Sequence, residues 1–299
     1  MIYEYAVSPA VFGDINNIAF LYEAFGIERG RFISEFPRKR EWSKYARQFI
    51  SKCARDQIER NALVELLIAL ERRALYERQR THWDDQKKWI DNALFENEQR
   101  AFRGILNRDS VVDHKDVMTI GDTWRATQWK NPQSISVPRT APNIVQAVMP
   151  LISLSTTLVL IDRNFEPMDA RFSKVLIEFA DQLLRQTHQP KIAQIKYVTT
   201  YESDKNTRRT INIFENECRT ALTTFLPRGI SVKFIIKVKK LLHDRFVLTN
   251  RGCIQLGIGL DEGDGDVLMN RLSNKDFEIQ FDAWNKQYCH EFLIEGTRS

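Results

Sequence analysis

The sequence predicts an α/β protein in which a mixed-sheet domain at residues 143–299 follows a mainly helical domain at residues 1–110. Two observations favour this class. After residue 143, short apolar segments typical of buried strands alternate with amphipathic segments of helical length. Before residue 110, apolar residues recur mostly at helical spacing. Residues 111–142 lose this periodicity and gain turn-forming residues, which indicates a connecting segment.

The expected elements can be placed along the chain from these patterns. In the first domain, helices are expected at residues 14–25, 41–76 and about 83–95. In the second domain, helices are expected at residues 143–154, 170–185, 208–225 and 275–288. Strands are expected at residues 156–162, 191–199, 230–237 and 267–273, with two more around His243 and Ile254.

Composition limits the classes of protein to consider. The 44 Lys and Arg against 39 Asp and Glu give a net charge of +5, which permits binding of a polyanion. The 4 cysteines stand far apart with no C-x-x-C pair, which indicates reduced thiols. The start of the sequence lacks the pattern of a signal peptide, and no apolar run reaches the roughly 20 residues of a membrane span. We therefore expect a cytoplasmic protein without a transmembrane segment.

Two stretches combine basic and aromatic residues. The first spans residues 29–42, and the second surrounds Trp124 and Trp129. Such stretches can hold phosphates and stack bases, or they can be connections whose aromatic rings anchor them to the core. Under the first interpretation, the candidate nucleic-acid-binding residues are Arg38, Lys39, Arg40, Trp42, Arg125 and Lys130.

Polar groups interrupt an apolar run at His243-Asp-Arg245. Side chains alternate along a strand, so His243 and Arg245 are expected on one side, together with Thr249. Taken alone, this pair is explained equally well by a structural ion pair and by an anion-binding site.

The stretch also carries a family resemblance. His243-Asp-Arg245, four further residues, Asn250 and then Gly257-Ile-Gly-Leu-Asp261 resemble a variant of the H-x-K-x4-D signature of the phospholipase D superfamily. The H-D-R form is similar to the phospholipase D-like domain at the carboxyl end of some microtubule-interacting-and-trafficking proteins and in prokaryotic proteins. The resemblance covers residues 143–299, and it implies a phospholipase D-like mixed-sheet domain.

The resemblance also implies roles for individual residues. His243 would attack phosphorus and form a phosphohistidine, while Arg245 would bind the phosphate, assisted by Thr249. Asn250 would orient the catalytic site, and Asp261 is a further candidate for orienting His243 or Arg245. Neither a metal nor another cofactor is implied.

Two departures from the signature affect this expectation. Arg replaces Lys at Arg245, which keeps the positive charge, whereas Asn replaces Asp at Asn250, which removes a carboxylate. The sequence holds one such motif, so a homodimer or a partner subunit would have to supply a second histidine. Asp261, Glu262, Asp264 and Asp266 form an acidic cluster, for which a solvated turn is favoured over a metal site.

The expected function is that of an intracellular protein engaging phosphodiesters, with DNA or RNA as the ligand and lipid disfavoured because no apolar docking surface is visible. Such a protein is either a metal-independent nuclease or a catalytically inactive scaffold or binding subunit. The context of related domains suggests a prokaryotic defence or mobile-element system. A restriction-type nuclease built on Asp162 and Gln194-Ile-Lys196 is disfavoured, because a predicted helix separates the two elements.

Overall fold

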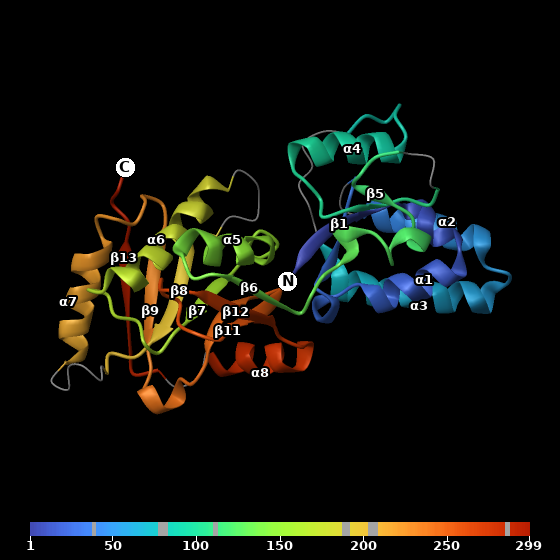
Figure 1. Ribbon diagram of the computed structural model, residues 1–299. Coiled ribbons are helices and arrows are strands. Elements are labelled where there is room, and N and C mark those ends of the chain that lie inside the picture. Colours follow the sequence, from blue (N-terminus) through green and yellow to red (C-terminus); the bar gives the residue numbers. More distant parts are fainter. Residues whose placement is uncertain (38–39, 77–82, 110–112, 187–191, 203–208, 285–287) are drawn as a thin grey trace. The chain divides into compact units, whose positions relative to one another are not determined.

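The computed structural model describes residues 1–37, 40–76, 83–109, 113–186, 192–202, 209–284 and 288–299. Within these ranges the protein is mixed α/β, with eight α-helices, one parallel sheet and one mixed sheet (Figure 1). The chain divides into two compact units. Residues 2–132 form the N-terminal unit, and residues 133–299 together with Met1 form the C-terminal unit.

The N-terminal unit is built on a parallel sheet with the strand order β3-β2-β1-β4-β5. Its strands are β1 (Tyr3–Val7), β2 (Arg31–Ser34), β3 (Leu75–Tyr76), β4 (Ile105–Leu106) and β5 (Val117–Met118). Its helices are α1 (Ile15–Ala24), α2 (Glu41–Cys53), α3 (Gln57–Ala74) and α4 (Trp89–Gln99).

Alternation along β1 divides the core of this unit between the two faces of the sheet. Tyr5 and Val7 pack into a cluster with residues of α1, α2 and α3, whereas Ala6 packs with Ile90 and Ala93 of α4. The helices therefore cover both faces (Figure 1).

The expectation of a mainly helical N-terminal domain needs correction. The expected helices are present, but they surround a five-stranded sheet that the sequence patterns did not reveal. The strand β2 lies inside the basic and aromatic stretch at residues 29–42, and β3, β4 and β5 have two residues each. Strands this short carry no detectable period-2 pattern.

The C-terminal unit contains an eight-stranded mixed sheet with the order β13-β9-β8-β7-β10-β11-β12-β6. Its strands are β6 (Ser134–Pro138), β7 (Leu158–Ile161), β8 (Gln194–Thr199), β9 (Ser231–Ile236), β10 (Arg245–Thr249), β11 (Gly252–Leu256), β12 (Asp266–Arg271) and β13 (His290–Glu295). The strands β7, β8 and β9 are parallel, and every other pairing in the sheet is antiparallel.

Helices cover both faces of this sheet as well. They are α5 (Ala141–Ile152), α6 (Ala170–Arg185), α7 (Ile211–Leu222) and α8 (Asn274–Trp284). Figure 1 shows α5 and α6 on one face and α8 on the other. Tyr197 of β8 packs with Phe165 and Phe234 in an aromatic cluster, whereas the ammonium of its neighbour Lys196 lies over the ring of Trp284 in α8.

The structure confirms the predicted alternation of helices and strands after residue 143. Helix α6 has the predicted bounds and is N-capped by Asp169, whose carboxylate accepts the Arg171 N–H at 3.1 Å. The edge strands β6 and β13 were not expected, and β6 lies in the segment predicted to be a connection. Within the described ranges, no helix combines the length and apolar character needed to cross a bilayer.

Candidate functional site

Polar side chains gather at one edge of the C-terminal sheet. The parallel strands β7, β8 and β9 all end at this edge, and β10 begins there because it runs antiparallel to β7. Asp162 follows β7, Lys237 follows β9, and His243 and Arg245 stand at the start of β10. In α/β sheets, ligands bind outside the carboxyl ends of the parallel strands.

Arg245 faces a buried carboxylate without a close ion pair. Its Nε lies 3.8 Å from Oδ1 of Asp162, which is fully buried. The Asp162 carboxylate already accepts the backbone N–H of Asn164 at 2.8 Å and that of Leu260 at 2.6 Å. Within the described residues, the Arg245 Nε–H has no hydrogen-bond acceptor. The Nε atom is itself buried, whereas the side chain is 21 % exposed, so the outer nitrogens of the guanidinium are the donors that an anion can reach.

The protonation of Asp162 reflects this environment. Burial raises the pKa of its carboxyl group, while the two backbone N–H groups and the Arg245 guanidinium oppose that rise. The nearby Asp261 carboxylate adds to the rise, because two like charges disfavour ionisation. Asp162 is thus a structural acceptor for the loop around Leu260 and only a partial counter-charge for Arg245.

His243 does not lie on the strand, contrary to expectation. It is exposed and precedes β10 in the segment that follows the short 3-10 helix η5 (Lys239–Leu241). Its side chain lines a cavity of about 160 Å³ together with Lys237, Phe246 and residues of α8. Arg245 does not line this cavity, because neighbouring strand residues point to opposite faces and Phe246 takes the α8 side.

Lys237 is a site residue that the sequence analysis did not single out. It is 5 % exposed, and its Nζ donates to the Ala283 carbonyl of α8 at 3.1 Å. Burial lowers the pKa of its ammonium group. The available signal was a lysine directly after the apolar run Phe234-Ile-Ile236, where a parallel sheet opens to its ligands.

Thr249 and Asn250 lie at the other end of the hairpin, away from His243 and Arg245. The Thr249 hydroxyl is buried and donates to the Gly252 carbonyl at 3.1 Å. The Asn250 Oδ1 accepts the N–H of Thr156 at 2.8 Å and that of Thr157 at 3.3 Å. Asn250 follows Arg245 by five residues of extended strand, which corresponds to a distance of about 17 Å along the strand. Neither side chain can take part in a site at the start of β10.

Asp261 has partners other than those expected. It pairs with the Arg139 guanidinium and lies 3.6 Å from that of Arg171. A Cβ added to Gly259 would come within 2.5 Å of Asp261 Oδ1 and 3.1 Å of Asp162 Oδ2. Asp261 therefore fixes the loop that covers Asp162, and it does not orient His243 or Arg245 directly.

The rest of the acidic cluster is occupied by contacts that shape the loop. Glu262 accepts the N–H of Ala141, the first residue of α5, at 2.9 Å, and it pairs with Lys174 at 3.1 Å. Asp266 accepts the Ser136 hydroxyl at 3.2 Å. In the part of the chain that the structure describes, no three His, Cys, Asp or Glu side chains are grouped to hold a metal ion.

The predicted nucleic-acid-binding residues separate into three groups. Trp42 is fully buried, its Nε1 donates to the Val7 carbonyl at 2.7 Å, and it is a core residue, so its predicted role is wrong. Arg38 and Lys39 lie outside the described residues. Arg40, Arg125 and Lys130 are exposed and accessible.

Among the described residues, no second histidine lines the cavity of His243. His290 of β13 lies 3.2 Å from the Glu215 carboxylate, and His114 belongs to the N-terminal unit. Neither lines the cavity of His243. His82 and His188 fall outside the described ranges. The arrangement of the described side chains is thus that of a single imidazole near cations.

The restriction-type alternative has no geometric support either. Lys196 pairs in register with Val159, three residues before Asp162, and its ammonium lies 4.7 Å from the centre of the Trp284 ring. Asp162 is instead turned toward Leu260 and Arg245. The carboxylate and the lysine therefore do not share a site.

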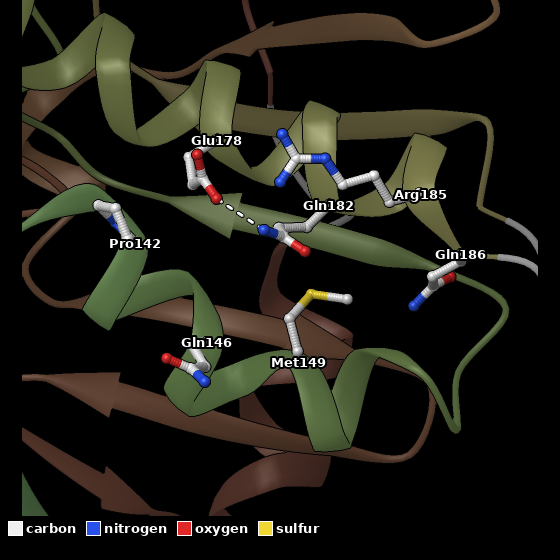
Figure 2. Close-up of a pocket in the computed structure, with 7 residues that line it drawn as sticks. All are labelled: Pro142, Gln146, Met149, Glu178, Gln182, Arg185 and Gln186. Atoms are coloured by element: carbon white, nitrogen blue, oxygen red, sulfur yellow. Dashed lines mark hydrogen bonds between the residues drawn. The ribbon is translucent and has the colours of Figure 1, made fainter. Parts of the chain in front are cut away.

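A separate cavity of about 440 Å³ lies between α5 and α6 (Figure 2). Its lining includes Met149, Gln182 and Arg185, and Gln182 donates to the Glu178 carboxylate at 2.8 Å. The amide of Gln186 is buried at its rim without a hydrogen-bond partner in the described part of the chain. With one arginine and one glutamate, this cavity has no net cationic character.

Comparison of the chain with family models finds no match, and comparison with curated proteins finds no match either. The function must therefore be argued from the site itself.

Proposed function

We propose that the C-terminal unit binds phosphodiesters of DNA or RNA at the edge where β10 begins. The observation that carries this proposal is the Arg245 guanidinium, which is 21 % exposed at this edge and has its nearest carboxylate, that of Asp162, 3.8 Å from its buried Nε. Arginine suits this role because its planar fork matches two phosphate oxygens. Lys237 and His243 lie at the same edge but line a separate cavity on the α8 side, which Arg245 does not line.

Binding without catalysis is the version that the contacts favour. The phosphohistidine mechanism needs a second imidazole to protonate the leaving group, and none of the described histidines shares the cavity of His243. The remoteness of Asn250 also removes the expected orienting group. A phospholipase D-like binding module is thus preferred over a nuclease within a single chain.

One observation favours the nuclease as the second candidate. His243 is exposed at the mouth of its cavity, where an incoming phosphodiester could reach it. If a second copy of the chain or a partner subunit supplies the other imidazole, the purified assembly will cleave DNA or RNA and His243→Ala will abolish the cleavage. Unchanged cleavage by this variant would exclude His243 as the nucleophile.

The binding proposal is tested with labelled single-stranded and double-stranded oligonucleotides by fluorescence anisotropy across a salt series. Arg245→Ala should weaken binding about tenfold and lower the salt slope by about one unit, because one phosphate contact is lost. Arg245→Lys should retain part of the affinity.

The matched control is Arg228→Ala, which removes an exposed arginine that precedes β9 at the opposite edge of the sheet. This variant should bind like the unchanged protein. Equal affinities for Arg245→Ala and Arg228→Ala, with both variants folded by circular dichroism, would refute the proposal.

A further inference from the structure

The N-terminal unit contains a large polar cavity of its own, about 710 Å³ in volume. Its walls come from the segments that follow β1, β4 and β5, together with Asn17 of α1. They include Asn107, Arg108 and Asp109 after β4, and Thr119, Gly121, Asp122 and Arg125 after β5, so that two arginines and two aspartates balance in charge. A volume of this size suits a small organic ligand, whose usual cavities span about 300–1,000 Å³.

The position of this cavity follows from the topology of the parallel sheet. From β1 the chain moves to β2 and β3 on one side, and β4 and β5 lie on the other side. The direction of winding therefore reverses between β1 and β4, where the Ser8 N–H donates to the Leu106 carbonyl at 2.8 Å. In open parallel sheets, a ligand crevice forms outside the carboxyl strand ends at such a reversal.

One of the two arginines in the cavity is held in place by a carboxylate. The Thr119 hydroxyl donates to Asp122 Oδ2 at 2.7 Å, and Arg125 donates to Oδ1 of the same group. The hydrogen bonds from Thr119 and Arg125 lower the pKa of the Asp122 carboxyl group. Because a guanidinium has five N–H donors, the ionised Asp122 orients Arg125 and leaves most of its donors for a ligand.

The second arginine is weakly paired. The Nε of Arg108 lies 4.0 Å from Oδ1 of Asp109, and the two side chains are 53 % and 70 % exposed. Exposed pairs at this separation contribute little, because water screens both charges. Arg108 can therefore turn toward a phosphate in the cavity at small cost.

An exposed tryptophan precedes Arg125 in the chain, outside the residues that line the cavity. Trp124, next to Arg125 in the chain, is 79 % exposed. By contrast, Trp129 packs at 5.7 Å in a stacked arrangement with Phe20 and lies under the Arg31 guanidinium. An exposed indole is suited to stack on a nucleobase that extends beyond the cavity.

We propose that this cavity binds a nucleotide, with Arg108 and Arg125 on its phosphates and Trp124 stacked on its base. The cavity has more room than inorganic phosphate needs, and its asparagine and threonine side chains can bind ribose hydroxyls. This site is independent of the phosphodiester site in the C-terminal unit.

The test uses the full-length protein and ATP as the probe, by isothermal titration calorimetry and tryptophan fluorescence. Arg108→Gln and Arg125→Gln should each weaken ATP binding about tenfold. Trp124→Ala should weaken it and remove most of the ATP-induced change in fluorescence. Arg125→Lys should recover part of the affinity if charge, rather than folding, is the cause.

Two controls separate this site from others. Arg55→Gln removes an arginine of the same unit that pairs with Glu59 and does not line the cavity, so ATP affinity should be unchanged. Arg245→Ala should also leave ATP affinity unchanged. Loss of ATP binding in Arg245→Ala but not in Arg108→Gln would assign the nucleotide to the C-terminal unit and overturn the proposal.

Two further outcomes would overturn it. Absence of ATP binding at millimolar concentration excludes a nucleotide of this type. Inorganic triphosphate that binds as tightly as ATP, with Trp124→Ala unchanged, would show an anion site without base recognition.

Discussion

Gly259 illustrates how a single residue controls the candidate site in the C-terminal unit. A Cβ at this position would lie 2.5 Å from Asp261 Oδ1 and 3.1 Å from Asp162 Oδ2. Both carboxylates are held by other contacts, Asp162 by two backbone N–H groups and Asp261 by Arg139. Neither can move away without losing a hydrogen bond, so the position requires glycine for space.

Gly259→Ala should therefore destabilise the protein by about 1–3 kcal/mol, the usual cost of overpacking. Denaturant unfolding followed by circular dichroism measures the change. The control is Gly257→Ala in the same loop, whose added Cβ would meet Leu268 atoms at 3.6 and 3.7 Å, an ordinary contact distance. Equal stability of the two variants would show that the carboxylates adjust freely.

In the hairpin of β10 and β11, residues that form one motif in the sequence lie at opposite ends of the structure. Its first end carries His243 and Arg245, and its turn carries Asn250. The amide oxygen of Asn250 accepts two N–H groups from residues that lead into β7. Asn250 therefore joins the turn to the neighbouring strand, and the four-residue spacing from Arg245 reflects the length of β10.

Asn250→Ala should cost about 0.5–1.5 kcal/mol of stability, because two N–H groups lose their acceptor and water can replace it at the exposed Thr156. Asn250→Asp keeps an acceptor and should cost less. Both variants should bind oligonucleotides like the unchanged protein in the anisotropy experiment. A large loss of oligonucleotide binding in folded Asn250→Ala would show that Asn250 contributes to the binding site after all.

Elements of the N-terminal unit show what local sequence cannot reveal. The helix α3 was predictable because Leu63, Leu67 and Leu70 repeat at helical spacing and become buried. The strand β1 was missed, although it is the central strand and its last three residues are fully buried. A strand of 5 residues is defined by its neighbours on both sides, and those neighbours lie far along the chain.

At the scale of the whole molecule, the four cysteines report on the folding of both units. All four lie within the described residues and are free thiols. Cys289 is exposed and Cys53 is half-buried, whereas Cys218 and Cys253 are fully buried. Burial raises the pKa of the Cys218 and Cys253 thiols, so the reactive thiolate is scarce there.

A thiol reagent such as DTNB should therefore label Cys289 first and Cys53 more slowly. Cys218 and Cys253 should react about a thousandfold more slowly than Cys289, since they become accessible only when the C-terminal unit opens. Cys289→Ser should remove the fast phase, and denaturant should release the protected pair. Fast labelling of all four thiols in the native protein would contradict the buried positions.

Local sequence patterns were enough to predict the alternation of helices and strands after residue 143, including α6 and the strands β7 to β12. These elements carry long periodic or continuous apolar patterns, which are local properties of the chain. The sequence motif also identified His243 and Arg245 as candidate site residues. The phospholipase D-like assignment is a proposal.

Which side chains meet depends on the tertiary structure. In the folded protein, Lys237 lines the same cavity as His243, and Arg245 lies 3.8 Å from Asp162. Asn250 lies in the turn at the far end of the hairpin. The tertiary structure also assembled the parallel sheet of the N-terminal unit and the polar cavity beside β1 and β4. The physical reason is that such contacts join residues tens to hundreds of positions apart, where neighbouring strands and burial override local pattern.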